Sequence, residues 1–362
     1  MKIEILQEQL LQGISTTLRA ISPRVQLPVL SHILLEADKQ GIILSATDLE
    51  LGIQMRVSAK VEEGGKITVP AKMLFEFLSS LSPGKVTLTS EGESLKVRSG
   101  GYSASFQTIT VEEFPSLPAF SKGIGEVSPE DIAAGVERVA FASARDSLRP
   151  VLTGVLLEFG KGLKLVATDG FRLAIQKVGL KNGTEQASLL VPARVMLELS
   201  RLSKDEPVQI GYLPESHQLL FANKEVLLVS QLIDGNFPDY TKIMPKEFET
   251  QLTASREELL QAVKAAYIFA RDNSNMMKWA VGDKKIVVTS TSPERGECSV
   301  ELPATIEGPG GSIVFNAKFV MDYLSIVSSE SIQFGMSSNL APGMFWEGKD
   351  DSGKYVVMPI NV

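Results

Sequence analysis

The stretch Ser45-Ala46-Thr47-Asp48 returns as Val166-Ala167-Thr168-Asp169, 121 residues further along the chain, and each copy follows an apolar run. A third stretch, Val288-Thr289-Ser290-Thr291, lies 122 residues beyond Ala167-Thr168 and keeps the character of a strand without the aspartate. Recurrence at a fixed period is the sequence signature of repeated structural units. A period of about 120 residues is too long for a solenoid repeat, so the pattern predicts three similar domains.

Two further landmarks recur in the same order. Thr68-Val69-Pro70-Ala71-Lys72 is matched by Leu190-Val191-Pro192-Ala193-Arg194 and by Val314-Phe315-Asn316-Ala317-Lys318. Each unit then closes on a proline that follows an apolar residue, at Phe114-Pro115, Phe237-Pro238 and Met358-Pro359. Chance does not explain three landmarks in one order with one period. We therefore predict domains at residues 1–122, 123–246 and 247–362.

Each predicted domain holds two helices packed on antiparallel strands, which makes the fold class α+β. Apolar residues at helical spacing, such as Leu10, Ile14 and Leu18, indicate a buried helix face. The helices are predicted at residues 7–22, 73–81, 129–143, 195–202, 255–270 and 319–327. Approximate alternation between Gly, Asn, Asp and Ser breaks predicts strands at residues 85–90, 94–98, 104–110, 208–212 and 225–231. Ser255, with Glu258 three residues later, matches a helix-starting capping box.

The composition is that of a globular chain with more than one core. Its 362 residues exceed a typical single domain, and 44% of them are hydrophobic. The single cysteine, Cys298, excludes an intrachain disulfide, and the N-terminus lacks an apolar stretch of signal or membrane length, so we expect a cytoplasmic protein without a membrane partner. The net charge of -7 argues against broad phosphate neutralisation, although a locally basic surface can coexist with an acidic total.

The sequence carries no pattern typical of a catalytic or metal site. Asp48 and Asp169 occupy matching Thr-Asp turns, and a duplicated turn-forming role explains them more simply than paired acid/base chemistry. His32 and His217 lie in different repeats without a spacing partner. The glycine-rich stretch at residues 308–312 lacks the lysine of a phosphate loop and is predicted to be a loop before a strand. We expect no catalytic residue, metal or cofactor.

Six stretches along the whole chain resemble the beta sliding clamp family of bacterial DNA polymerase III. The resemblance rests on Leu27-Pro28-Val29-Leu30, Ala46-Thr47-Asp48-Leu49-Glu50, Val69-Pro70-Ala71-Lys72, Ala167-Thr168-Asp169-Gly170-Phe171-Arg172-Leu173-Ala174, Asp234-Gly235-Asn236-Phe237-Pro238-Asp239-Tyr240 and Tyr355-Val356-Val357-Met358-Pro359. It implies a clamp fold and a head-to-tail homodimeric ring around double-stranded DNA, with helices lining the hole. The implied role is non-catalytic processivity, with docking of the replicative polymerase alpha subunit, the clamp loader, other polymerases and repair proteins.

The resemblance implies sequence-independent DNA contacts by basic residues on or beside the lining helices. These are Arg24, Lys72, Arg138, Arg145, Arg149, Arg194, Arg201, Lys264, Arg271 and Lys318, with Arg19 nearby. Arg24 and Arg149 match family positions that resemble DNA contacts most closely. Any one of these residues could equally be a solvated surface charge.

The resemblance also implies a groove for a short linear peptide. Its expected residues are Leu152, Thr168, Gly170, Phe171, Arg172, Leu173, Pro238, Lys242, Ile243, Val356, Met358, Pro359 and Ile360. A mostly apolar groove with a few orienting polar groups suits such a ligand. The alternative is that some of them, Leu173 and Val356 above all, form core. Phe171, Lys242 and Asn361 depart from the commonest family residues, which puts the preferred peptide motif in doubt.

A third implied surface is the subunit junction, where the first domain meets the third domain of the other chain. The apolar candidates are Met73, Phe77, Phe106, Tyr267 and Ile268, each of which could instead be intradomain core. Two other functions stay open on the residues alone. One is an enzyme whose site includes Thr168-Asp169, and the other is a scaffold that binds peptides but no DNA.

Overall fold

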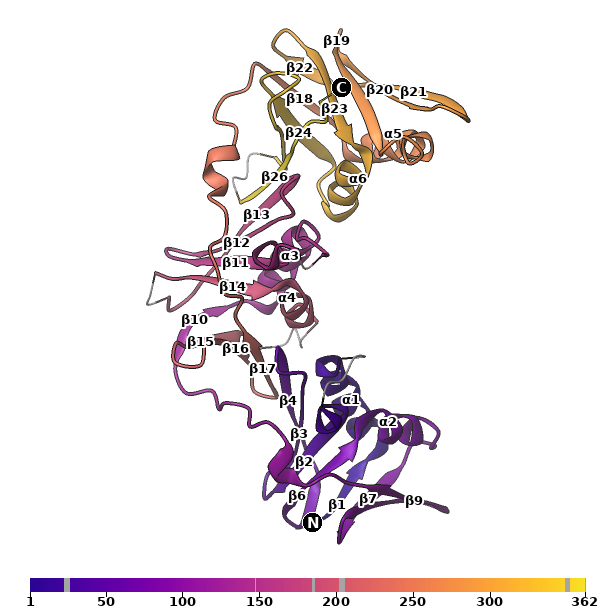
Figure 1. Cartoon of the computed structure of the whole chain (residues 1–362), viewed down its shortest axis with the longest axis vertical. Helices are drawn as coiled ribbons and strands as arrows, with labels where there is room; N and C mark the ends of the chain where they lie inside the picture. The colour runs from indigo at the N-terminus through magenta and orange to yellow at the C-terminus, as the bar shows by residue number, and fades with distance from the viewer. Residues whose placement is uncertain (23–26, 147, 184–185, 202–205, 349–351, 362) are drawn as a thin grey trace. The chain divides into compact units, whose positions relative to one another are not determined.

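A computed structural model describes residues 1–22, 27–146, 148–183, 186–201, 206–348 and 352–361. Within these residues the chain forms six α-helices and four antiparallel sheets, which confirms the predicted α+β class (Figure 1). The chain divides into two compact units. One unit comprises Met1–Pro129, Lys181–Thr184 and Arg201–Leu232, and the other Glu130–Leu180, Glu185–Ser200 and Ile233–Val362.

The six helices correspond to the six predicted ones. They are α1 Gln7–Thr17, α2 Ala71–Ser79, α3 Pro129–Ala140, α4 Ala193–Leu199, α5 Arg256–Ala270 and α6 Ala317–Ile326. The α1 helix ends before the predicted residue 22, because the Thr17 hydroxyl donates to the carbonyls of Gly13 and Ile14 and a 3-10 turn follows. At the start of α5, the Ser255 hydroxyl accepts from the Glu258 amide at 3.4 Å, which is half of the predicted capping box.

Two glycines let the first helix of a repeat approach its sheet closely. A Cβ on Gly13 of α1 would lie 2.4 Å from Leu44 Cδ1, and one on Gly135 of α3 would lie 2.6 Å from Val178 Cγ2. The two glycines are 122 residues apart and so occupy the same position of the repeat. Each helix therefore rests on its sheet at a distance that a larger residue would not permit.

The first unit is built on two sheets. One has the order β5-β1-β7-β8-β9, with bounds Lys60–Glu63, Lys2–Leu6, Lys85–Glu91, Ser94–Ser99 and Tyr102–Gln107. The other has the order β10-β15-β16-β17-β4-β3-β2-β6, with bounds Gly123–Val127, Val208–Leu213, Gln218–Ala222, Val226–Gln231, Leu51–Val57, Gly41–Thr47, His32–Asp38 and Gly65–Pro70. Because β17 of the second repeat pairs with β4 of the first, this sheet continues across the two repeats.

One predicted strand is displaced. The sequence predicted a strand at residues 104–110, whereas β9 ends at Gln107. The reason is that the Thr108 amide donates to the Glu93 carbonyl and the Ile109 amide donates to the Thr68 hydroxyl, so the chain leaves the ladder there.

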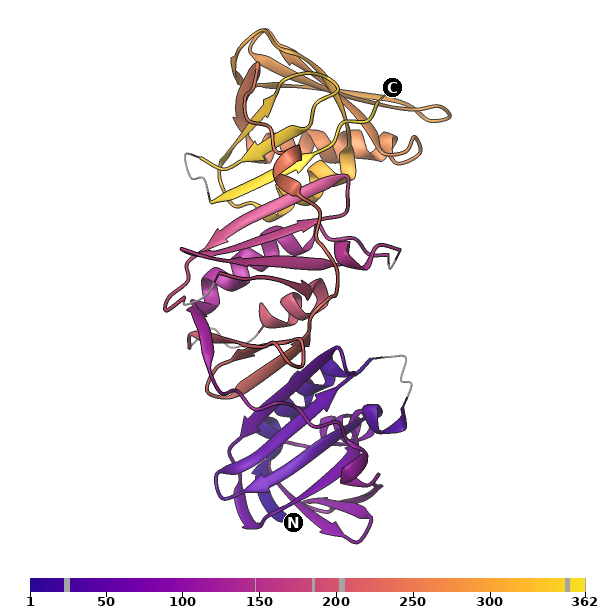
Figure 2. The same cartoon turned by 60° about the vertical axis from the view of Figure 1, so that its left-hand side comes forward.

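The second unit also has two sheets. The larger has the order β14-β11-β12-β13-β26-β25-β24-β18-β22, with bounds Ser188–Pro192, Gly154–Phe159, Leu163–Thr168, Arg172–Val178, Gly353–Val357, Gly343–Trp346, Ser331–Met336, Thr250–Ser255 and Thr305–Glu307. The smaller has the order β21-β20-β19-β23, with bounds Gly296–Pro303, Lys285–Ser292, Met276–Gly282 and Gly311–Asn316. In Figure 2 the pink β13 lies beside the yellow β26, so this sheet joins the second and third repeats.

An aromatic cluster forms the core of the third repeat. The Trp279 ring meets Phe315, Phe334 and Phe345 edge-on, and all four side chains are fully buried. None of the helices in the described part of the chain has the length and apolar character that a membrane crossing requires. Because the sheets run across the repeats, the division into three domains at residues 122 and 246 stays a prediction.

Candidate peptide groove and DNA-facing charges

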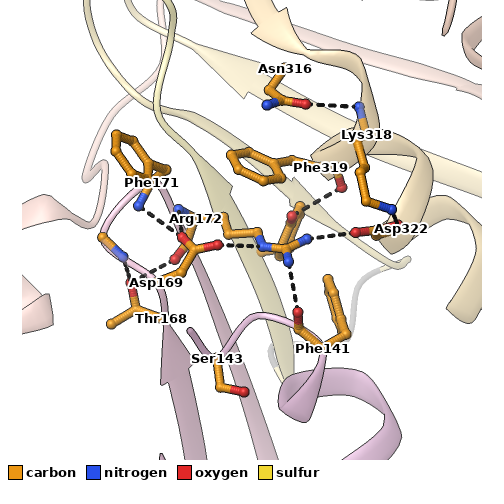
Figure 3. Close-up of polar contacts among 12 residues, drawn as sticks. Phe141, Ser143, Thr168, Asp169, Phe171, Arg172, Asn316, Lys318, Phe319 and Asp322 are labelled. Carbon is orange, nitrogen blue, oxygen red and sulfur yellow. Dashed lines mark hydrogen bonds and ion pairs between the residues drawn. The ribbon is translucent and has the colours of Figure 1, made fainter. Parts of the chain in front are cut away.

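The turn after β12 presents Phe171 to solvent. Asp169 Oδ1 accepts from the amides of Phe171 (2.9 Å) and Arg172 (3.0 Å), and the Thr168 hydroxyl accepts from the Gly170 amide at 3.0 Å. Gly170 has a φ of +93°, a conformation that favours glycine. The turn is therefore closed by its own side chains, and it leaves 60% of Phe171 exposed (Figure 3).

The first repeat contains the same turn. Asp48 Oδ1 accepts from the amides of Glu50 (3.2 Å) and Leu51 (2.9 Å), and the Thr47 hydroxyl accepts from the Leu49 amide at 3.0 Å. Both aspartates thus bond turn backbone, as predicted from their duplication. The Thr-Asp pair closes a turn in both copies, so its presence at Thr168-Asp169 gives no support to an enzymatic site there.

Arg172 is buried beneath this turn and crosses from the second repeat to the third. Its Nε donates to Asp169 Oδ2 at 2.9 Å, one terminal nitrogen donates to Asp322 Oδ2 at 2.8 Å, and the other donates to the Phe141 carbonyl at 2.8 Å. The Phe319 ring lies over the guanidinium at 4.5 Å (Figure 3). Each of the three guanidinium nitrogens of Arg172 thus donates a hydrogen bond, and only 7% of the residue is exposed.

The predicted groove residues divide into a buried layer and a surface layer. Leu152, Thr168, Arg172, Leu173 and Val356 are buried. The surface or half-buried members are Gly170, Phe171, Pro238, Lys242, Ile243, Met358, Pro359 and Ile360. For Leu173 and Val356 the structure shows the alternative that the sequence left open, because both belong to a core cluster with Leu156, Val166, Leu190, Tyr240 and Met344.

The C-terminal tail connects the Phe171 turn to the third repeat. The pairing of β13 with β26 sets Val357 opposite Arg172, and the next amide, Met358, donates to the Phe171 carbonyl at 2.9 Å. Two residues on, the Ile360 amide donates to the Val314 carbonyl at 2.8 Å. The tail thus runs from the Phe171 turn to β23, and its Met358, Pro359 and Ile360 side chains are half-buried.

The segment that carries Pro238, Lys242 and Ile243 is anchored on the same core. Phe237 packs against the cluster, and the buried Tyr240 hydroxyl donates to Glu158 at 2.7 Å and accepts from Lys164 at 3.2 Å. Burial, and after it the bond to the Glu158 carboxylate, raises the pKa of Tyr240. Lys242 is exposed and lies 3.3 Å from Asp239.

Sequence reasoning missed the residues that hold Arg172. Phe141 directly follows α3, whereas Phe319 and Asp322 both lie on α6, and Asp322 is 150 residues from Arg172. A weak signal was available, because Asp322 lies one helical turn after Lys318, which belongs to a repeated landmark. The two side chains form an ion pair at 3.3 Å.

The predicted DNA-facing residues differ in position and in exposure. On helices lie Lys72, Arg138, Arg194, Lys264 and Lys318; Arg201 and Arg271 lie within two residues of a helix end, and Arg145 and Arg149 follow α3 by five and nine residues. Lys264, Arg271, Arg145, Arg149 and Arg201 are exposed, and Arg194 is half-buried on α4. Three others form an ion pair with a carboxylate: Lys72 with Glu76 at 3.9 Å, Arg138 with Glu347 at 3.1 Å, and Lys318 with Asp322. Arg24 lies outside the described residues.

The predicted junction residues also divide. Met73 on α2 is 60% exposed and Ile268 on α5 is 56% exposed, as a contact surface requires. Phe77 and Tyr267 are half-buried. Phe106 is buried and meets the Phe77 ring edge-on at 5.8 Å, so in this structure it is intradomain core.

Comparison with known proteins covers the whole chain. Family models of the DNA polymerase III beta subunit match residues 1–118 (N-terminal domain), 126–239 (central domain) and 241–361 (C-terminal domain). The beta sliding clamp of Vibrio cholerae is 30% identical over 367 residues, which cover 100% of both chains. The beta sliding clamp of Staphylococcus aureus is 28% identical over 375 residues and 99% of each chain.

Solved structures resemble this chain over its full length. The DNA polymerase III subunit beta from Pseudomonas aeruginosa has a TM-score of 0.94 at 28% identity, and the match covers 100% of each chain. A second structure of a Pseudomonas aeruginosa sliding clamp, bound to griselimycin, has a TM-score of 0.95 at 28% identity with the same coverage.

Proposed function

The chain belongs to the DNA polymerase III beta subunit family and has the role of a sliding clamp, and from this premise we propose how its residues perform that role. Two chains form a closed ring around duplex DNA that gives the replicative polymerase its processivity without catalysing a reaction. The observation that carries this proposal is the full-length similarity to clamps, at a TM-score of 0.94 with all three repeats matched.

The ring reconciles an acidic protein with DNA. The formal net charge is -7, whereas Lys264 on α5, Arg271 directly after it and Arg145 in the segment that follows α3 are exposed. A ring holds DNA by topology, so its contacts with phosphates can be weak, independent of base sequence and mobile. Arg24, Lys72, Arg138, Arg149, Arg194, Arg201 and Lys318 complete the proposed DNA-facing set.

We propose that the two chains join through the edges of their smaller sheets. The strand β9 ends the five-stranded sheet and contains Phe106, and β21 ends the four-stranded sheet beside α5, which carries Tyr267 and Ile268. Pairing of two edge strands would satisfy backbone groups that are otherwise left open. Met73 and Phe77 on one chain would cover Tyr267 and Ile268 on the other, a head-to-tail contact that closes at two subunits.

The groove is the proposed docking site for partner proteins. Its surface layer offers the apolar side chains of Phe171, Pro238, Ile243, Met358 and Ile360 with the cation of Lys242, which suits a short peptide with large apolar residues. The partners would be the replicative polymerase alpha subunit, the clamp loader, other polymerases and repair proteins. Methionine at the centre adapts its shape to several partners.

The first test is the mass of the native protein by light scattering. We expect a dimer of two 39.3 kDa chains at micromolar concentration. The dimer should then be loaded on nicked circular DNA by a clamp loader and remain bound until the circle is linearised. A stable monomer, or equal retention on linear and circular DNA, would contradict the ring.

Removal of Met358, Pro359 and Ile360 tests the groove. We expect weaker binding of griselimycin, which binds the Pseudomonas aeruginosa relative, while retention on circular DNA is unchanged. The control variant is Glu93→Ala, at an exposed position of the β7–β8 turn outside the groove, and it should keep both activities. Equal loss of both activities would mean that the tail holds the fold together.

A further inference from the structure

The carboxylate of Asp322 on α6 is shared between two cations. Its Oδ2 accepts from Arg172 at 2.8 Å and its Oδ1 accepts from Lys318 at 3.3 Å, and Figure 3 shows both bonds meeting at this residue. The exposed fraction of the side chain rises from 7% for Arg172 through 22% for Asp322 to 45% for Lys318. The three groups therefore connect the protein interior to solvent.

The buried end of this series is fastened to the Phe171 turn. Arg172 Nε donates to Asp169 Oδ2 at 2.9 Å, and Asp169 Oδ1 accepts from the Phe171 amide at 2.9 Å. Every link from Lys318 to Phe171 is thus a hydrogen bond of 3.3 Å or less. A change of partner at Lys318 is felt at the turn through direct contacts.

The exposed end lies in the first turn of α6, where Lys318 belongs to the proposed DNA-facing set. The Asn316 side chain fixes this turn by accepting from the Lys318 amide at 3.0 Å, and the next residue, Phe319, lies over the Arg172 guanidinium. An ion pair that is this exposed is weak, and a phosphate is a strong partner for a lysine. A DNA phosphate beside Lys318 would therefore compete with Asp322 for its ammonium group.

This competition would change how firmly Arg172 is held. While Lys318 is paired with Asp322, it draws on the same negative charge as Arg172, and the two cations repel one another in a poorly solvated site. Transfer of Lys318 to a phosphate removes both effects, so the bond between Arg172 and Asp322 becomes stronger. A turn that is held more firmly lowers the entropic cost of packing a ligand against Phe171.

The first repeat has the same lysine pair without the connection. Lys72 occupies the landmark position of Lys318, and it pairs with Glu76 four residues later at 3.9 Å. The turn of that repeat has the buried Leu51 at the position of Arg172, and an apolar side chain cannot bond a carboxylate. The chain thus contains a DNA-facing lysine that is matched to Lys318 but is not linked to its turn.

We propose that Asp322 is a positioning residue that couples the groove to the DNA-facing surface, so that DNA inside the ring raises the affinity of the groove for its ligand. The inference rests on the proposed function, because it requires both the ring and the groove. Coupling between two binding sites is reciprocal, so a ligand in the groove would also strengthen the contact of Lys318 with DNA. A clamp that already encircles DNA would then be the form that partner proteins prefer.

The test compares the dissociation constant of griselimycin for the free ring and for the ring loaded on nicked circular DNA, after gel filtration has removed the clamp loader. We expect a value about threefold lower on DNA for the wild type, a difference of the size that an exposed ion pair contributes. Phe171→Ala should weaken griselimycin in both states, which establishes that the probe reports on the groove.

Four variants separate the coupling from a merely structural role. Lys318→Met should bind griselimycin equally with and without DNA, because Asp322 is then never shared, and Lys318→Arg should restore the difference. Asp322→Asn should remove the difference and weaken binding in both states. The matched control is Lys72→Met, which loses a DNA-facing charge in the first repeat and should keep the threefold difference.

Several results would overturn the inference. A wild type that binds griselimycin equally in both states, or less tightly on DNA, would exclude the coupling. A threefold difference that persists in Lys318→Met or Asp322→Asn, or one that Lys72→Met also abolishes, would assign it to other groups. In each of these cases the ring and the groove still stand. Failure of the ring to remain on circular DNA, or griselimycin binding that is unchanged in Phe171→Ala, would instead contradict the proposed function itself.

Discussion

Arg172 holds the Phe171 turn from beneath, and in the proposed groove its role would be to position that turn. Its guanidinium bonds Asp169 on the Phe171 turn, Asp322 on α6 and the Phe141 carbonyl. The first repeat forms the same turn with Leu51 at the matching position, so the turn itself does not need the arginine. Arg172 instead fixes the turn to α6, and with it Phe171 to the third repeat.

Replacement of Arg172 by methionine should destabilise the second unit strongly. The change removes the guanidinium that bonds Asp169 and Asp322 in a poorly solvated site and leaves Asp322 with Lys318 alone, which costs about 3–5 kcal/mol in comparable buried pairs. We expect a lower urea midpoint by circular dichroism. The control is Lys318→Met, which removes the other, more exposed partner of Asp322 and should change the midpoint little. A midpoint for Arg172→Met equal to that of Lys318→Met would contradict this role.

His32 should make the stability of the first unit sensitive to acid. Its side chain is buried on β2, its Nδ1 has no hydrogen-bond partner among the described residues, and burial lowers its pKa. The unfolded chain therefore binds a proton more readily than the folded chain, so this stability is present above about pH 6.5 and is lost as the pH falls.

The His32→Gln variant isolates this effect. Between neutral pH and pH 5 the thermal midpoint of the wild type should fall further than that of the variant, because the variant lacks the buried His32 while both proteins keep His217. Parallel loss in the two proteins would assign the acid sensitivity to other groups.

At the scale of elements, the helix-to-sheet distance depends on a glycine. Alanine has the higher helix propensity, yet Gly13→Ala should destabilise the protein, because the new Cβ would meet Leu44 Cδ1 at 2.4 Å. Overpacking of this kind costs about 1–3 kcal/mol. We expect a lower thermal midpoint by calorimetry, whereas Gln12→Ala on the exposed side of the same helix should leave it nearly unchanged. A rise in stability for Gly13→Ala would show that α1 can move away from the sheet.

At the scale of the whole molecule, assembly should depend on an exposed residue of α5. Ile268 is 56% exposed, and burying a carboxylate at the junction would be costly without a partner. Ile268→Asp should therefore shift the protein toward monomer in light scattering and shorten its retention on circular DNA. Ile243→Asp, an exposed apolar site in the groove, is the control and should leave the mass unchanged. A dimer that withstands Ile268→Asp would place the junction elsewhere.

The sequence by itself determined the threefold repeat, because landmarks that recur in one order can be recognised without knowing the fold. It also determined the α+β class and the six helices, because caps and apolar spacing are local patterns. The duplicated Thr-Asp turn was also predictable, since its hydrogen bonds span two or three residues. The end of β9 at Gln107 was not predictable, because the amides of Thr108 and Ile109 bond Glu93 and Thr68, which are distant in sequence, instead of the neighbouring strand.

Only the tertiary structure decided which predicted groove residues are exposed. Leu173 and Val356 lie in different repeats and meet in one core because β13 pairs with β26. Arg172 is buried because Asp322, which lies 150 residues further along the chain, is brought against the same turn and bonds its guanidinium. Residue type and spacing carry no record of such distant contacts, since burial depends on where the chain returns in space.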